Sequence, residues 1–444
     1  MYDEILELLE KKRYQELKAL MSDMNEADIA SILEEVPKEV LPLLYRILPK
    51  ELASDVFVNM ESDAQEILIR AFSDTELREV IDELYVDDAV DLIEEMPATV
   101  VKRILKHTDP EVRKSINDIL KYPEDSAGSL MTIEYVDLKK YMTVDDAFTR
   151  IRRTGVDKET IYVCYVTDEN RKLLGLVTVK DLLLSDKSKK MFEIMETNVI
   201  SVNTLEDKEV VADKFQKYDM LAIPVVDQEE RLVGIVTFDD AMDVLQEENT
   251  EDIEKMAAIT PTDKPYLKMG VFETWKKRIP WLLLLMVSAA FTGKIITHFE
   301  KALQAQIVLT SFIPMLMDTG GNCGGQSSVT IIRGLSLGDI DFKDILKVIW
   351  KEFRVAFLCG ITLAVANFAK LMLFDKVGLF VSATVCFTMI LTIIFAKLVG
   401  STLPIFAKKI GFDPAVMASP FITTIVDAIS LLVYFKVAGI ILEI

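Results

Sequence analysis

The sequence has little of what soft-metal sites require. It contains two histidines and four cysteines in 444 residues, and no two cysteines are spaced as Cys-x-x-Cys. Zinc and iron–sulfur centres need clusters of these side chains, so neither is expected. The remaining ligands are carboxylate, carbonyl and water oxygens, which suit hard cations such as Mg2+ and Ca2+.

Positive charge is scarce over the first 270 residues. Residues 271–444 hold 11 acidic and 16 basic side chains, and the whole chain carries −21, so residues 1–270 carry −26. An acidic surface repels phosphates, which argues against a nucleic-acid partner and favours cations. The mean hydropathy is nonetheless +0.26, so the chain divides into an acidic half and an apolar half.

Two further features are absent from the sequence. No Walker-type phosphate loop and no nucleophile–base constellation is legible, so we expect no enzyme and no nucleotide-driven pump. No signal peptide precedes the acidic start, so the N-terminal half is expected to stay in the cytosol.

Residues 1–127 are predicted to form an acidic all-α superhelical domain. Similar sequence motifs recur at 26–37 and 87–97. Prolines are expected to end several short helices. Asp87 and Asp91 lie four residues apart and therefore share a helix face. Most carboxylates here suit a solvated acidic face, and a few are expected to line a cation site shared with the next domain.

Residues 128–248 contain an internal repeat at an offset of 59, since the phrase 174–181 aligns with 233–240. Each unit is predicted to form a strand, an acidic turn, a second strand and a helix, with Thr178 and Thr237 as the N-caps of the helices. The repeat resembles a pair of CBS domains, here 128–187 and 188–248.

Two interpretations of these helix starts stay open. CBS pairs often bind adenine nucleotides through a Thr-x-x-Asp element, and Thr178–Asp181 and Thr237–Asp240 have this spacing; ATP is therefore a possible ligand. The same element is also an ordinary capped helix start. The second unit is strongly acidic, and its carboxylates suit hydrated Mg2+, which keeps several waters.

Residues 249–278 are predicted to be a connecting, or plug, helix with a break near Pro261 and Pro265. Its start, 246–254, is highly acidic. A rigid helix between a sensor and a membrane domain is suited to act as a lever, and a plain linker is the alternative.

Residues 279–444 contain five apolar runs long enough to span a membrane. They lie at about 279–298, 303–334, 353–374, 377–400 and 415–441. The second is interrupted by four glycines and polar residues between 316 and 326. We interpret this as a helix break lining a water-filled path, with close helix packing as the alternative.

Basic residues flank these runs at 276–278, 333–354 and 408–409. With these regions inside, five spans put the N-terminus in the cytoplasm and the C-terminus outside. We therefore expect a multi-pass protein of a bacterial or archaeal cell membrane.

Asp427 lies in the middle of the last apolar run. A carboxylate near the bilayer centre costs a few kcal/mol and usually marks an ion path or a proton relay. A carboxylate paired within a helix bundle is the alternative, but few cations are available in the neighbouring runs. We therefore interpret Asp427 as a cation site.

The order of domains and two phrases, 320–326 and 423–427, identify a family resemblance. Over essentially its full length the chain resembles the MgtE family of magnesium channels. The resemblance implies a homodimer with a pore at the subunit interface, in which Asp427 binds hydrated Mg2+. The matching pore phrases also contain Gly320, Gly321, Asn322, Thr423 and Thr424, whereas the place of Asp318 in the pattern is open.

The family also has cytosolic magnesium sites. The resemblance implies that sensor carboxylates are spread over the helical domain, the second CBS unit, the connecting helix and a membrane loop. They are Asp87, Asp91, Glu209, Asp219, Asp240, Asp243, Glu251, Asp252 and Asp413.

The sequence thus predicts a magnesium-selective channel or transporter that intracellular Mg2+ closes. Neutralising the repulsion between facing carboxylates would close the cytosolic domains on the pore. The alternatives are a carrier for another divalent cation such as cobalt or manganese, and a CBS-containing membrane sensor without transport.

Overall fold

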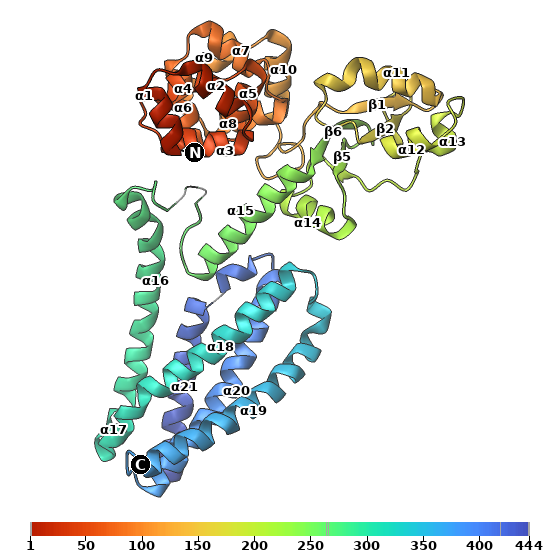
Figure 1. Ribbon diagram of the computed structural model, residues 1–444. Helices are drawn as coiled ribbons and strands as arrows, with labels where there is room; N and C mark the ends of the chain where they lie inside the picture. The colour runs from red at the N-terminus through yellow and green to blue at the C-terminus, as the bar shows by residue number, and fades with distance from the viewer. Residues whose placement is uncertain (1, 263, 265, 418, 443–444) are drawn as a thin grey trace. The chain divides into compact units, whose positions relative to one another are not determined.

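The computed structural model describes residues 2–262, 264, 266–417 and 419–442, which form two compact units, 1–245 and 246–444. Figure 1 traces the chain through both units, which are described separately below.

The first unit begins with ten short helices (Figure 1). Helix α5 begins directly after Pro49 and α9 directly after Pro97, so these prolines separate the helices as expected. Contacts run from α3 to α5, α4 to α6 and α7 to α9, the pattern of a superhelix. The helices are α1 (Tyr2–Glu10), α2 (Tyr14–Ser22), α3 (Glu26–Glu35), α4 (Leu41–Tyr45), α5 (Lys50–Val58), α6 (Ser62–Ala71), α7 (Asp74–Ile81), α8 (Val86–Glu95), α9 (Ala98–His107) and α10 (Pro110–Ile119).

Two similar three-stranded sheets follow, with strand orders β1-β2-β3 and β4-β5-β6. The register repeats at the offset found in the sequence, because Val163 pairs with Thr178 and Ala222 with Thr237. The first half contains β1 (Val136–Lys139), α11 (Val144–Thr154), η1 (Gly155–Asp157), β2 (Val163–Thr167), β3 (Leu173–Thr178), α12 (Val179–Leu184) and α13 (Met191–Ile194). The second contains β4 (Val202–Asn203), α14 (Lys208–Tyr218), β5 (Ala222–Val226), β6 (Leu232–Thr237) and α15 (Phe238–Met256).

The helical domain and the second CBS half share one hydrophobic core. Leu92 of α8, Phe215 of α14 and Val236 of β6 belong to the same buried cluster. Acidic side chains at the edge of this core are therefore held beside one another by apolar packing.

The connecting segment differs from the prediction. Helix α15 begins at Phe238 and ends at Met256, so the predicted boundary at 248/249 falls inside a helix. The described residues between these two helices, 257–262, 264 and 266–270, are non-helical, and the next helix begins at Val271. Pro265 lies outside the described residues.

The second unit contains five long helices and several short ones. Four pass as membrane spans by length and composition among the described residues, counting the adjoining 3-10 turns: 271–298, 342–373, 379–409 and 414–442. The helices are α16 (Val271–His298), α17 (Glu300–Ala305), η2 (Ile307–Phe312), α18 (Ile313–Ser336), η3 (Phe342–Asp344), α19 (Ile345–Leu373), α20 (Leu379–Lys409), η4 (Pro414–Met417) and α21 (Ser419–Leu442).

The predicted break in the second run is wrong. Helix α18 is continuous through residues 320–326. With 24 residues it has the length to span, but its polar residues make it less apolar than the other four. Glycine disfavours a helix by about 1 kcal/mol relative to alanine, and tight packing on α20 and α21 offsets this cost.

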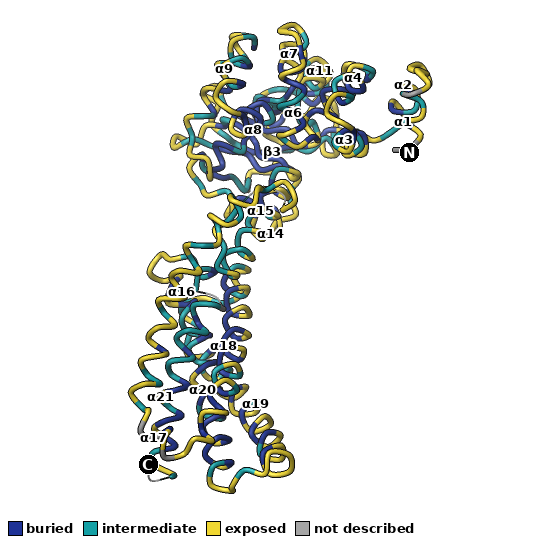
Figure 2. Tube along the Cα trace, turned by 90° about the vertical axis from the view of Figure 1, so that its left-hand side faces the viewer, coloured by how far each residue is buried: buried dark blue, intermediate teal, exposed yellow. Residues whose placement is uncertain are grey.

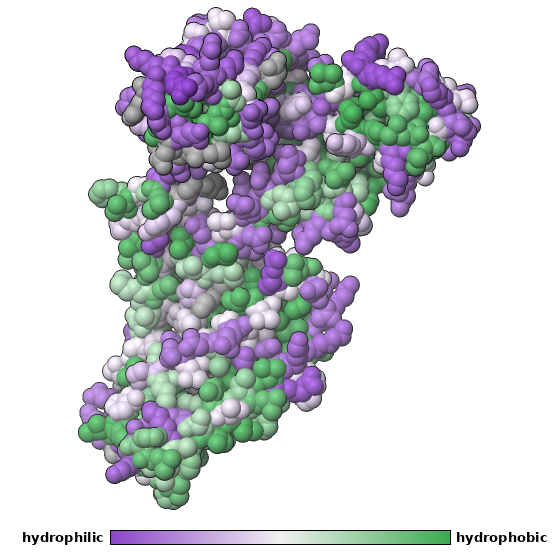
Figure 3. Space-filling view, in the orientation of Figure 1, coloured by the Kyte–Doolittle hydropathy of each residue, from purple (hydrophilic) through white to green (hydrophobic). Residues whose placement is uncertain are grey.

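The glycines of α18 allow backbones to approach closely. A Cβ placed at Gly400 of α20 would lie 2.2 Å from the carbonyl oxygen of Gly324. Figure 2 shows many buried residues along α18 and α20, whereas α16 is largely exposed. The surface seen in Figure 3 is mainly hydrophilic over the helical domain and largely hydrophobic over the second unit, as expected for a water-exposed and a lipid-exposed unit.

Candidate functional site

Carboxylates from both parts of the first unit meet where α8 packs against the CBS pair. Asp87 is 8% exposed, and its Oδ1 has no hydrogen-bond partner within the described part of the chain. Burial raises the pKa of Asp87 well above its usual range, and repulsion by Asp240 raises it further. Thr237 donates its hydroxyl to Oδ2 of Asp240. Thus an unsatisfied buried carboxylate of the helical domain lies near a carboxylate of the second CBS half.

Neighbouring acids strengthen this negative potential. Burial raises the pKa of Asp88 to about 7, with repulsion by Asp240 as the next cause. Burial likewise raises the pKa of Glu159 to about 8, followed by repulsion from Asp239. For Asp240 itself, burial raises the pKa to about 6 against the opposing hydrogen bond from Thr237.

The predicted residues Asp91 and Asp243 lie at the margin of this cluster. Both are exposed, and Asp91 is repelled by Asp240. Burial raises the pKa of Asp243, as does repulsion by Asp239. The sequence prediction missed Asp88 and Glu159 as members of the cluster, since nothing in the local pattern distinguishes them from surface acids.

Within the residues that the structure describes, no three His, Cys, Asp or Glu side chains form a preorganised metal site. Mg2+ needs only one or two carboxylates because it retains much of its water shell. Asp87 and Asp240, which repel each other, therefore have the chemistry to bind the water shell of a hydrated ion.

Two predicted sensor residues lie elsewhere. Glu209 lies in the first turn of α14 and Asp219 is its C-cap, and a separation of ten positions corresponds to about 15 Å along the helix axis. Asp219 adopts a left-handed conformation with φ of 51° and terminates the helix. The structure therefore does not bring these two side chains together.

The remaining predicted sensor residues gather in the second unit. Lys255 Nζ lies 2.7 Å from Asp413 Oδ2 and also pairs with Glu251. Burial raises the pKa of Asp252, and repulsion by Asp413 raises it further. Lys255 thus occupies the centre of a second acidic cluster, which the sequence prediction described without its cation.

The nucleotide elements are capped helix starts. Thr178 accepts from the backbone N–H of Asp181, and the Asp181 carboxylate accepts from the N–H of Thr178, which closes a capping box at α12. Thr237 and Asp240 make the corresponding side-chain contact at α15. Helix capping alone therefore accounts for the Thr-x-x-Asp spacing, and no bound nucleotide is needed to explain it.

The predicted pore residues lie on α18 and α21, which pack antiparallel. A Cβ at Gly320 would contact Val426 and Ser430, and one at Gly321 would contact Thr423. The same alignment puts Asp318 beside Asp427, and Asp318 is the charged neighbour that acts on Asp427. The two carboxylates thus lie close enough to repel each other.

Several polar side chains near Asp318 and Asp427 are exposed or half-buried in the single chain. Asp318 and Asn322 are exposed, and Asp427, Thr423 and Thr424 are half-buried. The hydroxyls of Thr423 and Thr424 donate to the carbonyl of Pro420 within their own helix, and the methyl group of Thr423 lies against Gly321.

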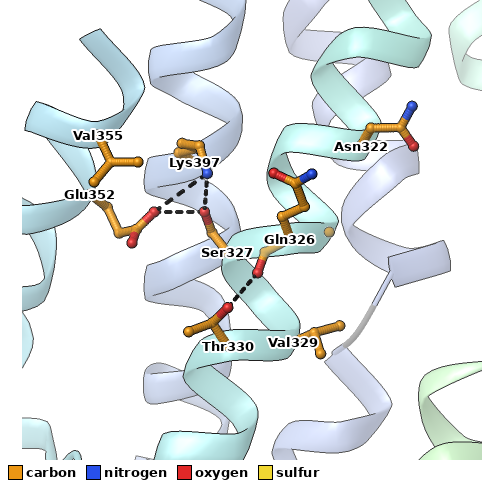
Figure 4. A pocket seen from close by; sticks show the side chains of 9 residues that line it. Asn322, Gln326, Ser327, Val329, Thr330, Glu352, Val355 and Lys397 are labelled. Atoms are coloured by element: carbon orange, nitrogen blue, oxygen red, sulfur yellow. Dashed lines mark hydrogen bonds and ion pairs between the residues drawn. The ribbon is translucent and has the colours of Figure 1, made fainter. Parts of the chain in front are cut away.

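A membrane ion pair was missed in the sequence. Glu352 of α19 and Lys397 of α20 face each other across Ser327 of α18 and line a cavity of about 750 Å3 (Figure 4). Their helices are distant in sequence, and the predicted third span began one residue after Glu352. Lys397 is therefore the intramembrane cation that the sequence interpretation lacked, and it pairs with Glu352 and not with Asp427.

Comparisons with known proteins place these features in a family. The MgtE intracellular N domain matches residues 24–125, CBS domains match 127–187 and 191–247, and the divalent cation transporter MgtE matches 313–437. The magnesium transporter MgtE of Thermus thermophilus is 36% identical over 98% of this chain and 97% of its own length. The chain belongs to the MgtE family of magnesium transporters.

Other members of the family agree with this assignment. The magnesium transporter MgtE of Bacillus subtilis is 33% identical over 98% of this chain and 97% of its own length. The crystal structure of the cytosolic domain of the Mg2+ channel MgtE in complex with ATP is 34% identical, with a TM-score of 0.53 over 55% of this chain and all of that chain. The soluble part of a magnesium transporter matches at 28% identity, with a TM-score of 0.53 over 56% of this chain and 97% of that chain.

Family membership supports the predicted order of a helical N domain, tandem CBS domains and a membrane unit of apolar helices. It also identifies magnesium transport as the family's function, which is not an enzymatic one. The assignment of individual ion ligands, the oligomeric state and the orientation in the membrane remain predictions.

Proposed function

We propose that this chain is a magnesium-selective channel that cytosolic Mg2+ closes. The observation that supports it most is that α21 packs against Gly320 and Gly321 of α18, an arrangement in which Asp318 lies close enough to Asp427 to repel it. A pair of carboxylates at membrane depth is costly unless it handles a cation. In a homodimer, each subunit would supply one Asp427 to hydrated Mg2+ on the axis.

The membrane potential is sufficient to drive uptake. A divalent ion moving inward gains about 4.6 kcal/mol per 100 mV, twice the value for a single charge. The basic residues at the loop ends support an orientation with both sensor clusters on the cytosolic side and the C-terminus outside. No energy source beyond the potential is then required.

Gating would depend on the two acidic clusters. When Mg2+ is scarce, Asp87, Asp88 and Asp240 repel one another and the helical domain separates from the CBS pair. Bound Mg2+ removes this repulsion and stabilises the packed form. Helix α15 joins the CBS pair to the cluster around Asp413 and would carry the change to the membrane unit.

The pore assignment is tested by Mg2+ uptake into liposomes containing the purified protein. Asp427→Asn keeps the side chain's shape and removes its charge, and Asp427→Ala removes both. We expect either variant to abolish uptake, and also to fail to support a host that lacks magnesium transport. Ser430→Ala, one turn away, is the matched control; normal uptake by Asp427→Asn would refute the assignment.

Gating is tested by deleting residues 1–250. The truncated channel should conduct at cytosolic Mg2+ concentrations that close the full chain. Closure that persists in the truncated form would refute the cluster of Asp87, Asp88 and Asp240 as the sensor.

We also propose that ATP binds the CBS pair, because a relative's cytosolic domain was crystallised with ATP. Titration of the protein with ATP, compared with Asp181→Ala, tests this point. The same affinity in both proteins would exclude the Thr178–Asp181 element as the ribose site.

A further inference from the structure

Polar side chains form a continuous stripe along α18. Asp318, Asn322, Gln326 and Thr330 are spaced four residues apart and are all exposed in the single chain. Their twelve-residue span covers about 18 Å of helix axis. Lipid chains offer no hydrogen bonds, so this stripe must face water or protein.

Ser327, Glu352 and Lys397 form a hydrogen-bonded triad beside the part of this stripe that contains Gln326 and Thr330 (Figure 4). Ser327 donates its hydroxyl to Glu352 Oε2 at 2.7 Å, and Lys397 donates to Ser327 Oγ at 3.1 Å. The ammonium of Lys397 lies 3.8 Å from the same Oε2. Lys397 and Glu352 have side chains that are 6% and 13% exposed.

The triad borders an open cavity and does not fill it. Asn322, Gln326 and Thr330 line the same cavity of about 750 Å3 as Glu352 and Lys397. At about 30 Å3 per water, this volume holds on the order of 25 waters. A Mg2+ ion with six waters therefore fits.

One oxygen of Glu352 remains available to this cavity. Both contacts of its carboxylate go to Oε2, and among the described residues Oε1 has no protein partner. A carboxylate with one oxygen held and one oxygen free is suited to accept a hydrogen bond from the water shell of a cation.

We propose that Glu352 is a second cation station on the conduction path, and that Lys397 weakens it enough for the ion to leave. The proposal rests on the proposed function, since it assumes that the chain conducts Mg2+. Conduction requires binding that is favourable yet readily reversed. The ammonium of Lys397 reduces the net charge of the station without occupying Oε1.

A purely structural ion pair predicts a different result. Removing either member of such a pair leaves one buried charge without its partner and destabilises the bundle, and removing both restores it. The station predicts opposite effects, since loss of Glu352 weakens cation binding and loss of Lys397 strengthens it.

The test is block of Mg2+ flux in proteoliposomes by cobalt(III) hexaammine, which resembles hydrated Mg2+ but cannot lose its ligands. We expect Glu352→Gln to raise the half-blocking concentration about tenfold, the effect of losing a hydrogen bond to a charged group. Lys397→Gln should lower it by a similar factor and also lower the maximal flux, because the ion leaves more slowly.

The double variant Glu352→Gln/Lys397→Gln should keep the weak block of Glu352→Gln. Shifts in the same direction in both single variants, with recovery in the double variant, would overturn the proposal in favour of a structural pair. Unchanged block in Glu352→Gln would overturn it as well.

A milder variant covers the case in which Lys397→Gln does not fold. Ser327→Ala removes one hydrogen bond from the carboxylate and leaves every charge in place, so it should strengthen block about two- to threefold. Weaker or unchanged block in Ser327→Ala would overturn the proposal.

The outcomes separate this proposal from the channel function. A wild-type protein that passes no Mg2+ refutes the proposed function and with it the station. Flux that depends on Asp427, together with same-direction shifts at Glu352 and Lys397, refutes the station alone.

Discussion

Lys255 Nζ of α15 lies 2.7 Å from Asp413 Oδ2, directly before the last membrane helix. The lysine therefore links the helix that leaves the CBS pair to the helix that carries Asp427. It also neutralises part of an acidic cluster that contains Glu251 and Asp252. A tethered ammonium and Mg2+ would compete for the same carboxylates.

Lys255→Gln should therefore make the channel more sensitive to cytosolic Mg2+. Without the ammonium, Asp413 and its neighbours attract Mg2+ more strongly, and a gain of about 1 kcal/mol lowers the half-closing concentration roughly fivefold. Flux measured at a series of internal Mg2+ concentrations gives this value.

Lys347→Gln is the matched control, because Lys347 forms an exposed pair with Asp344 in the same unit. Its half-closing concentration should equal that of the wild type. A higher value in Lys255→Gln would show that the Lys255–Asp413 pair itself holds the closed form.

The second prediction concerns the glycine contact between α18 and α20. Gly400→Ala places a methyl group 2.2 Å from the Gly324 carbonyl, so the helices must separate. Overpacking of this kind costs about 1–3 kcal/mol. We expect a lower melting temperature of the detergent-solubilised protein, followed by tryptophan fluorescence, because Trp275, Trp281 and Trp350 all lie in the second unit.

Gly293→Ala controls for the substitution itself. A Cβ at Gly293 of α16 meets nothing within 4 Å, and alanine favours a helix over glycine by up to about 1 kcal/mol. Its melting temperature should be unchanged or higher. Equal destabilisation by both variants would contradict the close contact.

The sequence predicts the CBS pair well because its signals are local. The offset of 59 reappears in the strand register, and Thr178 caps its helix as expected. Helix α18 was predicted wrongly because glycine is a weak helix former and only its packing partners, such as Gly400, favour the continuous helix. Those partners are distant in sequence.

The candidate sites, too, were predictable only where the signal is local in the sequence. Asp427 stands out because a single carboxylate interrupts an apolar run. Glu352 and Lys397 lie on different helices, near the ends of their apolar runs, and their pairing is visible only in three dimensions. The separation of Glu209 from Asp219 likewise depends on the length of α14.

A third prediction follows from the capping box of α12. Thr178→Ala removes the side-chain acceptor for the N–H of Asp181 and should destabilise the CBS pair by about 1 kcal/mol. Urea unfolding of a fragment covering residues 1–256 measures this, with Thr149→Ala as control, since Thr149 is an exposed residue that bonds only within α11. No loss in Thr178→Ala would contradict a stabilising role for this capping box.

The last prediction concerns pH. Burial raises the pKa of Asp88 to about 7 and that of Glu159 to about 8, above the usual carboxyl values. These two carboxyls therefore bind more protons in the packed form than in the unfolded chain. Their contribution to stability is fully present below a pH of about 4 and is lost as pH rises through these values to about pH 8.

Thermal unfolding of the 1–256 fragment between pH 5 and 8 should show this loss in the absence of divalent cations. Millimolar Mg2+ should reduce it, because the ion replaces the protons that screen the carboxylates. Asp87→Asn removes the most buried charge and should raise the melting temperature at pH 8 while reducing the response to Mg2+. Glu169→Gln, in the exposed turn between β2 and β3, is the control and should retain both the pH slope and the Mg2+ response. A slope that Mg2+ and Asp87→Asn both leave unchanged would contradict the assignment of this cluster as a cation sensor.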